Sequence, residues 1–308
     1  MSMGSFATRT VATLVVATDG TGDFTDIQTA INALPANGGC VYIKEGTYNI
    51  TVPIVIDSNN VSIMGCGRST IIAQQTNNAD CIQVSNCTGN IIENVYLHGP
   101  ALIGGYAVNY NTVDHSYIRF IWFDNFTYGI YLTESTYNYI SGNETTGTGI
   151  AGGIWLTSNS DYNIISSNMI SGCASAGIYL NVSEHCIISS NICSDNDIYG
   201  IEIISLYVVV NSNTCSGNTS HGIYLTAGRN NIVDGNDVFD NGGDGISLMS
   251  DDNDIISNNR CRDNTNEINI SNAFCDKNLV LGNICLGAHV AAIVDNGTNT
   301  HIGHNITA

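Results

Sequence analysis

Residues 177–225 read GIYLNVSEHCIISSNICSDNDIYGIEIISLYVVVNSNTCSGNTSHGIYL, and the phrase that opens this stretch also closes it. The same Gly-Ile-x-Leu phrase, or a close variant, recurs with glycines that step by 24, 24, 23, 22 and 23 residues. These glycines are Gly129, Gly153, Gly177, Gly200, Gly222 and Gly245. One unit this short cannot bury its own apolar side, so the units must stack on one another.

An asparagine column follows the repeated phrase. Its members are Asn143, Asn168, Asn191, Asn213, Asn236, Asn259, Asn283 and Asn305. A strand residue rises about 3.3 Å, so a unit must coil before its residues can align with those of the next unit at about 4.8 Å. We therefore predict an all-β fold, a single-stranded parallel β-helix with aliphatic columns inside and asparagines stacked in its turns. The Leu-x-x-Leu-x-Leu signature of the competing leucine-rich solenoid is absent.

The N-terminal part of the chain differs from the repeats. Apolar residues have helical spacing over 27–34, Gly38-Gly39 ends this segment, and a strand begins at 41–43. A short amphipathic helix here would cover the open end of the coil and its unpaired strand edge. We expect one continuous domain, with residues 1–50 as entry strand and capping helix and residues 51–308 as coils of about 23 residues.

The composition excludes several classes of function. The formal net charge is −19 and only eight residues are Lys or Arg, so the chain lacks the basic surface that nucleic acid requires. No run of about 18 apolar residues is present, which argues against a membrane-spanning helix. The first nine residues contain no apolar signal-peptide core.

The cysteines favour a structural role. Cys193, Cys215, Cys261 and Cys285 recur at one place in the repeat, each two residues after a column asparagine. Ile170 and Val238 take the equivalent place in neighbouring units, which is typical of a small buried apolar position. We expect buried reduced thiols and no metal site, with a Cys193–Cys215 bridge between adjacent coils as the alternative.

The chain resembles the pectin-lyase-like superfamily. The resemblance rests on Asp19-Gly20-Thr21-Gly22-Asp23-Phe24, on the Gly-Gly-Cys-Val-Tyr-Ile and Glu45-Gly46-Thr47-Tyr48 that follow, and on the later repeats, which are similar to carbohydrate-binding and sugar-hydrolase repeats. It implies a right-handed parallel β-helix. The superfamily includes lyases, polygalacturonases, pectin esterases, epimerases, virus tailspikes and proteins without known catalysis, so fold alone does not choose a function.

The variable residue of the repeated phrase must point outward, because the Ile and Leu on either side of it point inward. This outward column contains an aromatic stripe, defined as Tyr131, Trp155, Tyr179 and Tyr224, which is interrupted by Glu202. Aromatic faces are good platforms for sugar rings. The alternative is that these residues simply suit strands and pair across coils.

Candidate catalytic residues lie beside this stripe. Tyr199, His221 and Asp244 each precede a repeat glycine and should occupy adjacent coils near Glu202. Glycoside hydrolysis requires two carboxyl groups about 5–10 Å apart, and Glu202 with Asp244 is the pair whose coil spacing fits. Asp244-Gly245-Ile246 resembles the Asp-Gly-Ile of polygalacturonases, although that family's Gly-His-Gly and Arg-x-Lys motifs are absent at matching places.

Two further features are candidates for function. Asp114, His115, Arg119 and Asp124 form a second polar group, and Trp122-Phe123-Asp124 faintly resembles a pectate-lyase strand motif. An aliphatic column beside the second core column would form an exposed strip if the strands alternate regularly, and such a strip marks an association surface. The strip consists of Ile164, Ile187, Val209, Ile232, Ile255 and Leu279.

These observations predict a protein, extracellular or virion-associated, that recognises a weakly charged polysaccharide. They leave open whether it is an enzyme, and glycoside hydrolysis is the first reaction to consider. Its substrate-binding residues are Tyr131, Trp155, Tyr179, Tyr199 and Tyr224, and its catalytic residues are Glu202, Asp244 and His221. The first alternative is a non-catalytic adhesive or tailspike-like module that forms a homotrimer. The second is a uronate lyase or epimerase. No cofactor is expected, except calcium if the substrate is a uronate.

Overall fold

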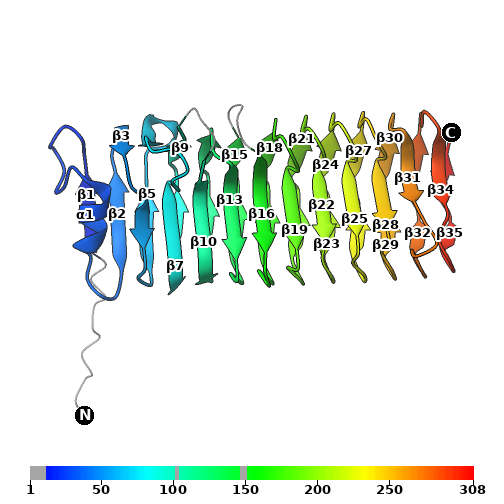
Figure 1. The fold of residues 1–308 in the computed structure, drawn as a ribbon, viewed down its shortest axis with the longest axis horizontal. Helices are drawn as coiled ribbons and strands as arrows, with labels where there is room; N and C mark the ends of the chain where they lie inside the picture. The colour runs from blue at the N-terminus through cyan, green and yellow to red at the C-terminus, as the bar shows by residue number, and fades with distance from the viewer. Residues whose placement is uncertain (1–11, 101–103, 146–150) are drawn as a thin grey trace, which may run out of the picture.

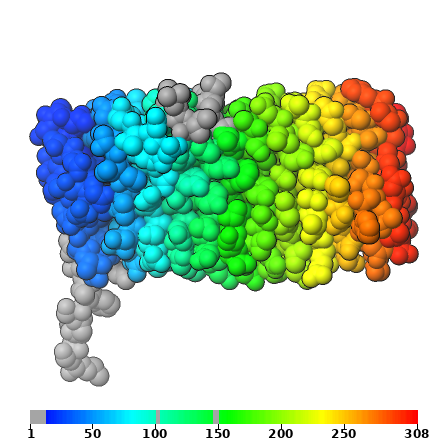
Figure 2. All heavy atoms as spheres, in the orientation of Figure 1, coloured from blue at the N-terminus to red at the C-terminus, as the bar shows by residue number. Residues whose placement is uncertain are grey.

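The structure is a computed structural model that describes residues 12–100, 104–145 and 151–308. Residues 1–11, including the segment without a signal-peptide core, lie outside the described ranges. The chain winds as a stack of coils along one axis, with the N-terminal helix at one end and the C-terminus at the other (Figure 1). The space-filling view shows the sequence progressing evenly along this axis (Figure 2). The predicted parallel β-helix is confirmed.

Three parallel sheets form the sides of the coil, and each receives one strand per complete turn. Sheet A contains β1 (Ala12–Val16), β2 (Gly39–Ile43), β5 (Val61–Met64), β8 (Ile91–Glu93), β11 (Tyr117–Arg119), β14 (Tyr139–Ser141), β17 (Ile164–Ser166), β20 (Ile187–Ser189), β23 (Val209–Asn211), β26 (Ile232–Asp234), β29 (Ile255–Ser257), β32 (Leu279–Leu281) and β35 (His301–Gly303). Sheet B contains β3 (Gly46–Ile50), β6 (Thr70–Gln74), β9 (Tyr96–His98), β12 (Trp122–Asp124), β15 (Glu144–Thr145), β18 (Met169–Ser171), β21 (Ile192–Ser194), β24 (Thr214–Ser216), β27 (Asp237–Phe239), β30 (Arg260–Arg262), β33 (Ile284–Leu286) and β36 (Ile306–Thr307). Sheet C, which carries the Gly-Ile-x-Leu phrases, contains β4 (Ile54–Ile56), β7 (Ile82–Thr88), β10 (Tyr106–Asp114), β13 (Tyr128–Thr133), β16 (Gly152–Thr157), β19 (Ile178–Asn181), β22 (Ile201–Ile204), β25 (Ile223–Thr226), β28 (Ile246–Met249), β31 (Asn266–Ile270) and β34 (Ala291–Asp295).

Like residues lie on top of one another in every sheet. In sheet C, Ile178 pairs with Ile201 of the next coil and Ile201 pairs with Ile223. The inward residues of all three sheets form one continuous aliphatic core, in which almost every side chain is inaccessible to solvent. The recurring cysteines belong to this core, and Cys193 and Cys215 are free thiols in adjacent coils.

The column asparagines form a buried ladder at the bend between sheets A and B. Asn213 donates from Nδ2 to Oδ1 of Asn236 in the next coil at 3.0 Å and to the Ile188 carbonyl at 2.9 Å. Its own Oδ1 accepts from the backbone and side-chain nitrogens of Asn191, both at 2.9 Å. Each bend is preceded by one residue with positive φ, such as Ser212, which turns the chain sharply. The asparagine side chains thus satisfy the backbone groups that the bend leaves without a strand partner.

A second ladder occupies the bend between sheets B and C. Asn196, Asn218, Asn241 and Asn264 are linked by amide-to-amide hydrogen bonds of 2.9 Å. The ladder ends where Asn264 donates to the buried carboxyl group of Glu267. The bends before and after sheet B therefore each contain an asparagine ladder. The ladder at the bend between sheets B and C fixes the register of the strands that enter sheet C.

The capping helix α1 (Ile27–Asn32) is shorter than the segment predicted from the pattern, since Ala33 forms its C-cap and Pro35 follows. A short 3-10 helix, η1 (Gly67–Ser69), is the only other helical element in the described ranges. Gln28 closes the first edge of sheet C, because its side-chain amide accepts from Val55 N at 2.7 Å and donates to Val55 O at 3.1 Å. A glutamine side chain thus takes the place of a further strand at this edge.

We predict that Asn213→Ala lowers the free energy of unfolding by about 2–4 kcal/mol, because it leaves buried donors and acceptors of two neighbouring coils unpaired. Urea denaturation followed by circular dichroism measures this loss. Asn49→Ala, at an exposed asparagine, is the matched control and should change stability by less than about 0.5 kcal/mol. Equal effects of the two variants would contradict a stabilising role for the ladder.

Candidate functional site

The aromatic stripe lies on the outer face of sheet C, as the alternation of the repeated phrase predicts. Strand pairing places Tyr131 beside Trp155, Trp155 beside Tyr179, and Glu202 between Tyr179 and Tyr224. All five side chains are partly exposed, whereas the Ile and Leu residues beside them are inaccessible. Each of these five side chains therefore comes from a regular strand rather than from a loop.

The rings of the stripe pack against one another. The ring centres of Trp155 and Tyr179 are 4.2 Å apart, and those of Tyr106 and Tyr131 are 4.6 Å apart. Tyr128 contacts Trp155 with its ring centre at 4.5 Å and a tilt of 53°. Tyr106 thus extends the stripe by one coil toward the N-terminus, and Tyr128 widens it within the coil of Tyr131; neither residue was predicted to belong to the site. The sequence could have indicated both residues, because Tyr128 directly precedes the repeat glycine Gly129 and Tyr106 takes the matching position in the preceding coil.

This packing limits how the stripe can bind a ligand. Where rings stack in parallel, each face is covered by the next coil, so ring edges and phenolic hydroxyl groups remain for a ligand. The rings beside Trp155 are tilted, at 53° for Tyr128 and 33° for Tyr179, so they do not stack on it face to face. Gly152 makes this tilt feasible, because a Cβ atom at that position would lie 1.9 Å from Trp155 Nε1. The indole occupies the space above the glycine backbone.

The stripe is interrupted at Glu202. Tyr179 precedes it and Tyr224 follows it, and Tyr199 of its own coil stacks on Tyr224 with ring centres 4.8 Å apart. Burial among these rings raises the pKa of Glu202 to about 7, because water no longer solvates the charged form well. Within the described part of the chain, no hydrogen bond or ion pair offsets this cost. A carboxyl group with this pKa can give up or accept a proton near neutral pH.

His221 and Asp244 contact each other, as predicted. The backbone N–H of Asp244 donates to His221 Nδ1 at 2.9 Å, and Asp244 Oδ2 lies 3.5 Å from the same nitrogen. Burial lowers the pKa of His221, and the nearby Asp244 charge opposes this shift. An Nδ1 that accepts the backbone N–H leaves the proton of the neutral ring on Nε2. His221 is therefore a hydrogen-bond donor at neutral pH.

Asp244 is buried, which its place in the repeat did not reveal. Its side chain accepts hydrogen bonds from Asn266 Nδ2 at 2.6 Å and from Asn269 Nδ2 at 2.7 Å, and the residue is 5% exposed. Two coils separate it from Glu202, which corresponds to about 10 Å along the axis. This spacing is near the range of inverting glycosidases. The amides of Asn266 and Asn269 thus engage both carboxylate oxygens of Asp244.

The second polar group from the sequence does not form one site. Asp114 accepts from Thr136 Oγ1 at 2.7 Å, and His115 stacks on Tyr137 with ring centres 5.1 Å apart. Arg119 forms an ion pair with Glu93, which leaves Asp124 in a separate cluster on sheet B. Residues that are close in the chain diverge here, because the chain passes from sheet C to sheet A and then to sheet B within this segment.

The aliphatic strip faces solvent on sheet A. Ile187 is 38% exposed, whereas Ile188 beside it is fully buried. Ile232 and Ile255 are exposed to a similar degree. The strands therefore alternate regularly, and the expectation of an outward aliphatic column is confirmed.

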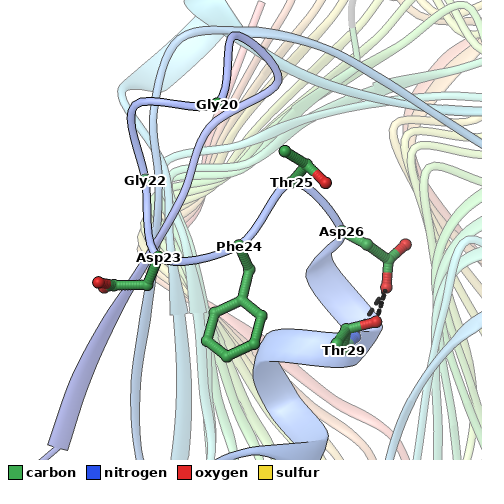
Figure 3. Close-up of a pocket in the computed structure, with 7 residues that line it drawn as sticks. All are labelled: Gly20, Gly22, Asp23, Phe24, Thr25, Asp26 and Thr29. Atoms are coloured by element: carbon green, nitrogen blue, oxygen red, sulfur yellow. Dashed lines mark hydrogen bonds between the residues drawn. The ribbon is translucent and has the colours of Figure 1, made fainter.

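An open hollow at the N-terminal end is a structural feature of the cap. The residues that line it are Gly20, Gly22, Asp23, Phe24, Thr25, Asp26 and Thr29 (Figure 3). Asp26 accepts from Thr29 N and Oγ1, both at 2.7 Å, and thereby caps α1. Asp23 accepts from Val15 N at 2.9 Å, and its carboxylate points away from that of Asp26 (Figure 3). Both carboxylates thus serve the local backbone.

In the described ranges, no group of three or more His, Cys, Asp or Glu side chains is arranged to hold a metal ion. No helix in those ranges is long and apolar enough to cross a membrane.

Comparison with known proteins gives a family match and several similar structures. The family described as the right handed beta helix region matches residues 41–206 and 152–307. The A-module of the Azotobacter vinelandii mannuronan C-5 epimerase AlgE6 is similar with a TM-score of 0.71 at 18% identity, over 92% of this chain and 94% of that module. A Thermotoga maritima exopolygalacturonase has a TM-score of 0.67 at 11% identity, over 91% and 86% of the two chains. Tailspike protein 2 of Escherichia coli O157:H7 bacteriophage CAB120 has a TM-score of 0.63 at 12% identity, over 83% and 40%. At these identities the similarity shows the fold alone.

Similar curated sequences cover only a short segment. Probable pectinesterase 56 from Arabidopsis thaliana is 37% identical over 81 residues, which are 25% of this chain and 28% of that protein. Pectinesterase 5 from the same plant is 44% identical over 69 residues, or 21% and 12% of the two sequences. The chain thus spans less than a third of the length of these curated relatives.

Glu202 predicts a specific pH dependence of stability. The pKa of Glu202 is about 7 in the folded chain and 4.5 in the unfolded chain. The contribution of this group to the free energy of unfolding is therefore complete below about pH 4.5 and is lost as the pH rises through 7. We predict that, as the pH rises from 4.5 to 8, the free energy of unfolding of Glu202→Gln increases by about 1–2 kcal/mol relative to that of wild type. This is less than the full pKa shift implies, because the carboxyl group is partly exposed. Urea denaturation of both proteins at several pH values measures this difference. A stability difference that is constant with pH would contradict the burial effect.

Proposed function

This chain belongs to the right-handed β-helix family, and from that premise we propose that it binds a weakly charged polysaccharide along sheet C and hydrolyses it. The observation that carries the proposal is the interruption of the aromatic stripe by Glu202. A long row of aromatic edges and hydroxyl groups suits successive sugar rings, and the protonatable carboxyl group lies within that row. The polysaccharide-acting names of the similar structures are consistent with this proposal.

In the proposed reaction, Glu202 is the general acid. A pKa near 7 keeps it protonated in a large fraction of molecules at neutral pH, so it can protonate the oxygen of a glycosidic bond that lies across the stripe. Asp244 is the second carboxylate and would activate water after Asn269 or Asn266 moves aside. His221 donates from Nε2 to a hydroxyl group of the bound sugar and does not act as the base.

The charge of sheet C supports a neutral or weakly charged glycan. The outward column contains Gln83, Asn109, Tyr131, Trp155, Tyr179, Glu202, Tyr224, Ser247 and Asn269, and none of these is basic. A uronate would therefore meet one carboxyl group, that of Glu202, and no cation in this column, and its binding would require a cation such as calcium. This observation disfavours the lyase or epimerase alternative.

We predict that Trp155→Ala and Tyr179→Ala each weaken binding to the best ligand of a neutral glycan array about 5- to 10-fold, since a lost aromatic contact is worth about 1–1.5 kcal/mol. Isothermal titration calorimetry measures the affinities, and release of reducing ends measures hydrolysis. Glu202→Gln should retain binding and lose hydrolysis at least about 100-fold.

Tyr207→Asn is the matched control for this experiment. Tyr207 is an exposed aromatic residue with positive φ at the bend between sheets C and A, and asparagine tolerates that backbone conformation. The affinity of Tyr207→Asn for the same glycan should equal that of wild type. Unchanged affinities of the Trp155 and Tyr179 variants would refute binding at the stripe, and full hydrolysis by Glu202→Gln would refute the assigned acid.

A second candidate function is adhesion by an oligomer that associates through sheet A. The exposed aliphatic strip carries this candidate, because six successive coils present an Ile, Val or Leu side chain to solvent in one line. A strip along the axis would be buried if copies packed with parallel axes, and three copies around one axis would cover all three strips.

We expect light scattering of the purified chain to give the mass of a trimer in this case. The double variant Ile187→Lys and Ile232→Lys should give the mass of a monomer, since two buried lysines per interface would cost more than the contact gains. The same substitutions leave the core untouched, so the melting temperature of the monomeric fold tests for misfolding. A monomeric wild-type chain would exclude this candidate.

A further inference from the structure

A second reactive cluster lies on sheet B, on a different face from the aromatic stripe. His98 ends β9 and pairs in register with Asp124, which ends β12. His98 Nδ1 lies 2.7 Å from Asp124 Oδ1. The Tyr96 hydroxyl group donates to Asp124 Oδ2 at 3.0 Å, and Asn125 Nδ2 lies 3.4 Å from the same oxygen. Three side chains thus converge on one carboxylate.

This geometry determines the state of the imidazole. A carboxylate accepts hydrogen bonds only, so in the neutral imidazole of His98 the proton is on Nδ1 and the lone pair is on Nε2. The Asp124 side chain is 12% exposed, whereas the His98 side chain is 42% exposed. The orienting carboxylate is therefore buried and the basic nitrogen belongs to an accessible side chain, an arrangement typical of an activated general base.

The cluster departs from the repeat in a specific way. Later strands of sheet B place Ser171, Ser194 and Ser216 at the corresponding position, in register with one another. Gly99 follows His98, and a Cβ atom there would lie 2.1 Å from the Asn125 carbonyl oxygen. The close approach of the two strand ends therefore depends on this glycine, and it holds His98 and Asp124 together on regular strands.

The neighbouring residues restrict the chemistry. Among the described residues of β9, β12 and β15, the only other carboxylate is Glu144, which binds Arg68 at 2.7 Å and Trp122 Nε1 at 3.0 Å. No second free carboxyl group is present there for glycoside hydrolysis. Arg68 is held by Glu144 and Arg119 by Glu93, so neither is free to stabilise a carbanion. A single oriented base suits attack of water on an activated carbonyl group.

We propose that His98, oriented by Asp124 and Tyr96, is the general base of a second site that hydrolyses acyl esters on sugar hydroxyl groups. His98 Nε2 takes a proton from water as the water oxygen bonds to the ester carbonyl carbon. The tetrahedral intermediate then breaks its bond to the sugar oxygen, which receives the proton from His98, and the products are a carboxylic acid and a free hydroxyl group. His98 is the catalytic residue, and Asp124 and Tyr96 are positioning residues. Only the sugar nature of the substrate rests on the proposed function.

The test uses p-nitrophenyl acetate, an ester without a sugar, so that its outcome is independent of glycan binding on sheet C. Wild type should hydrolyse this ester above the buffer rate, and His98→Asn should lose at least about 100-fold of the enzymatic rate. Asparagine can still donate to Asp124 through Nδ2 but offers no base. Asp124→Asn should lower kcat at least 10-fold with little change in KM, as expected for a positioning residue.

His185→Asn is the matched control. His185 is an exposed histidine with positive φ that stacks between Tyr162 and Tyr207, and its replacement should leave ester hydrolysis unchanged. Circular dichroism melting of each variant checks the fold. Wild-type hydrolysis no faster than buffer, or full activity in His98→Asn with a native melting curve, would overturn the proposal. Loss of ester hydrolysis together with intact glycan binding, or the reverse, separates this site from sheet C.

Discussion

The asparagine ladder between sheets A and B is the interaction on which the rest of the structure depends. It pairs the backbone groups of a sharp bend with side chains of the neighbouring coils, and it does so at the same place in successive coils. A bend that repeats without slippage keeps every strand in register with the next one. Register in turn places each outward residue directly above its equivalent, so columns in the sequence become continuous surfaces.

The stacking of equivalent residues from successive coils both forms the candidate binding surface and limits what it can contact. Aromatic residues in successive coils cover one another's faces, which stabilises the stripe and leaves edges and tilted rings for a ligand. The same spacing has the opposite effect on a charged residue within the row. The tyrosines in the coils before and after Glu202 shield its carboxyl group from water. This burial raises the pKa of Glu202, although the same packing stabilises the rings.

The repeat allowed accurate prediction of columns and poor prediction of contacts between columns. The outward position of Trp155, the adjacency of His221 and Asp244, and the exposed aliphatic strip all follow from alternation and period. The burial of Asp244 does not, because it depends on the rotamers of Asn266 and Asn269 in the next coil. The His98–Asp124 contact was equally hidden, since His98 lies in no motif and its partner is 26 residues away.

The amino-acid sequence by itself determined the coil, its core, and which residues face outward, because these depend on local alternation and on a period that any stacked unit must respect. Only the tertiary structure decided which outward residues touch, which carboxyl groups lose water, and which bases are oriented. Those properties arise from side chains that meet across coils and bends. Their distances are set by the spacing of about 4.8 Å between neighbouring strands and by the angle of each bend. The fold is thus encoded in what repeats, and the chemistry depends on where the exceptions to the repeat come into contact.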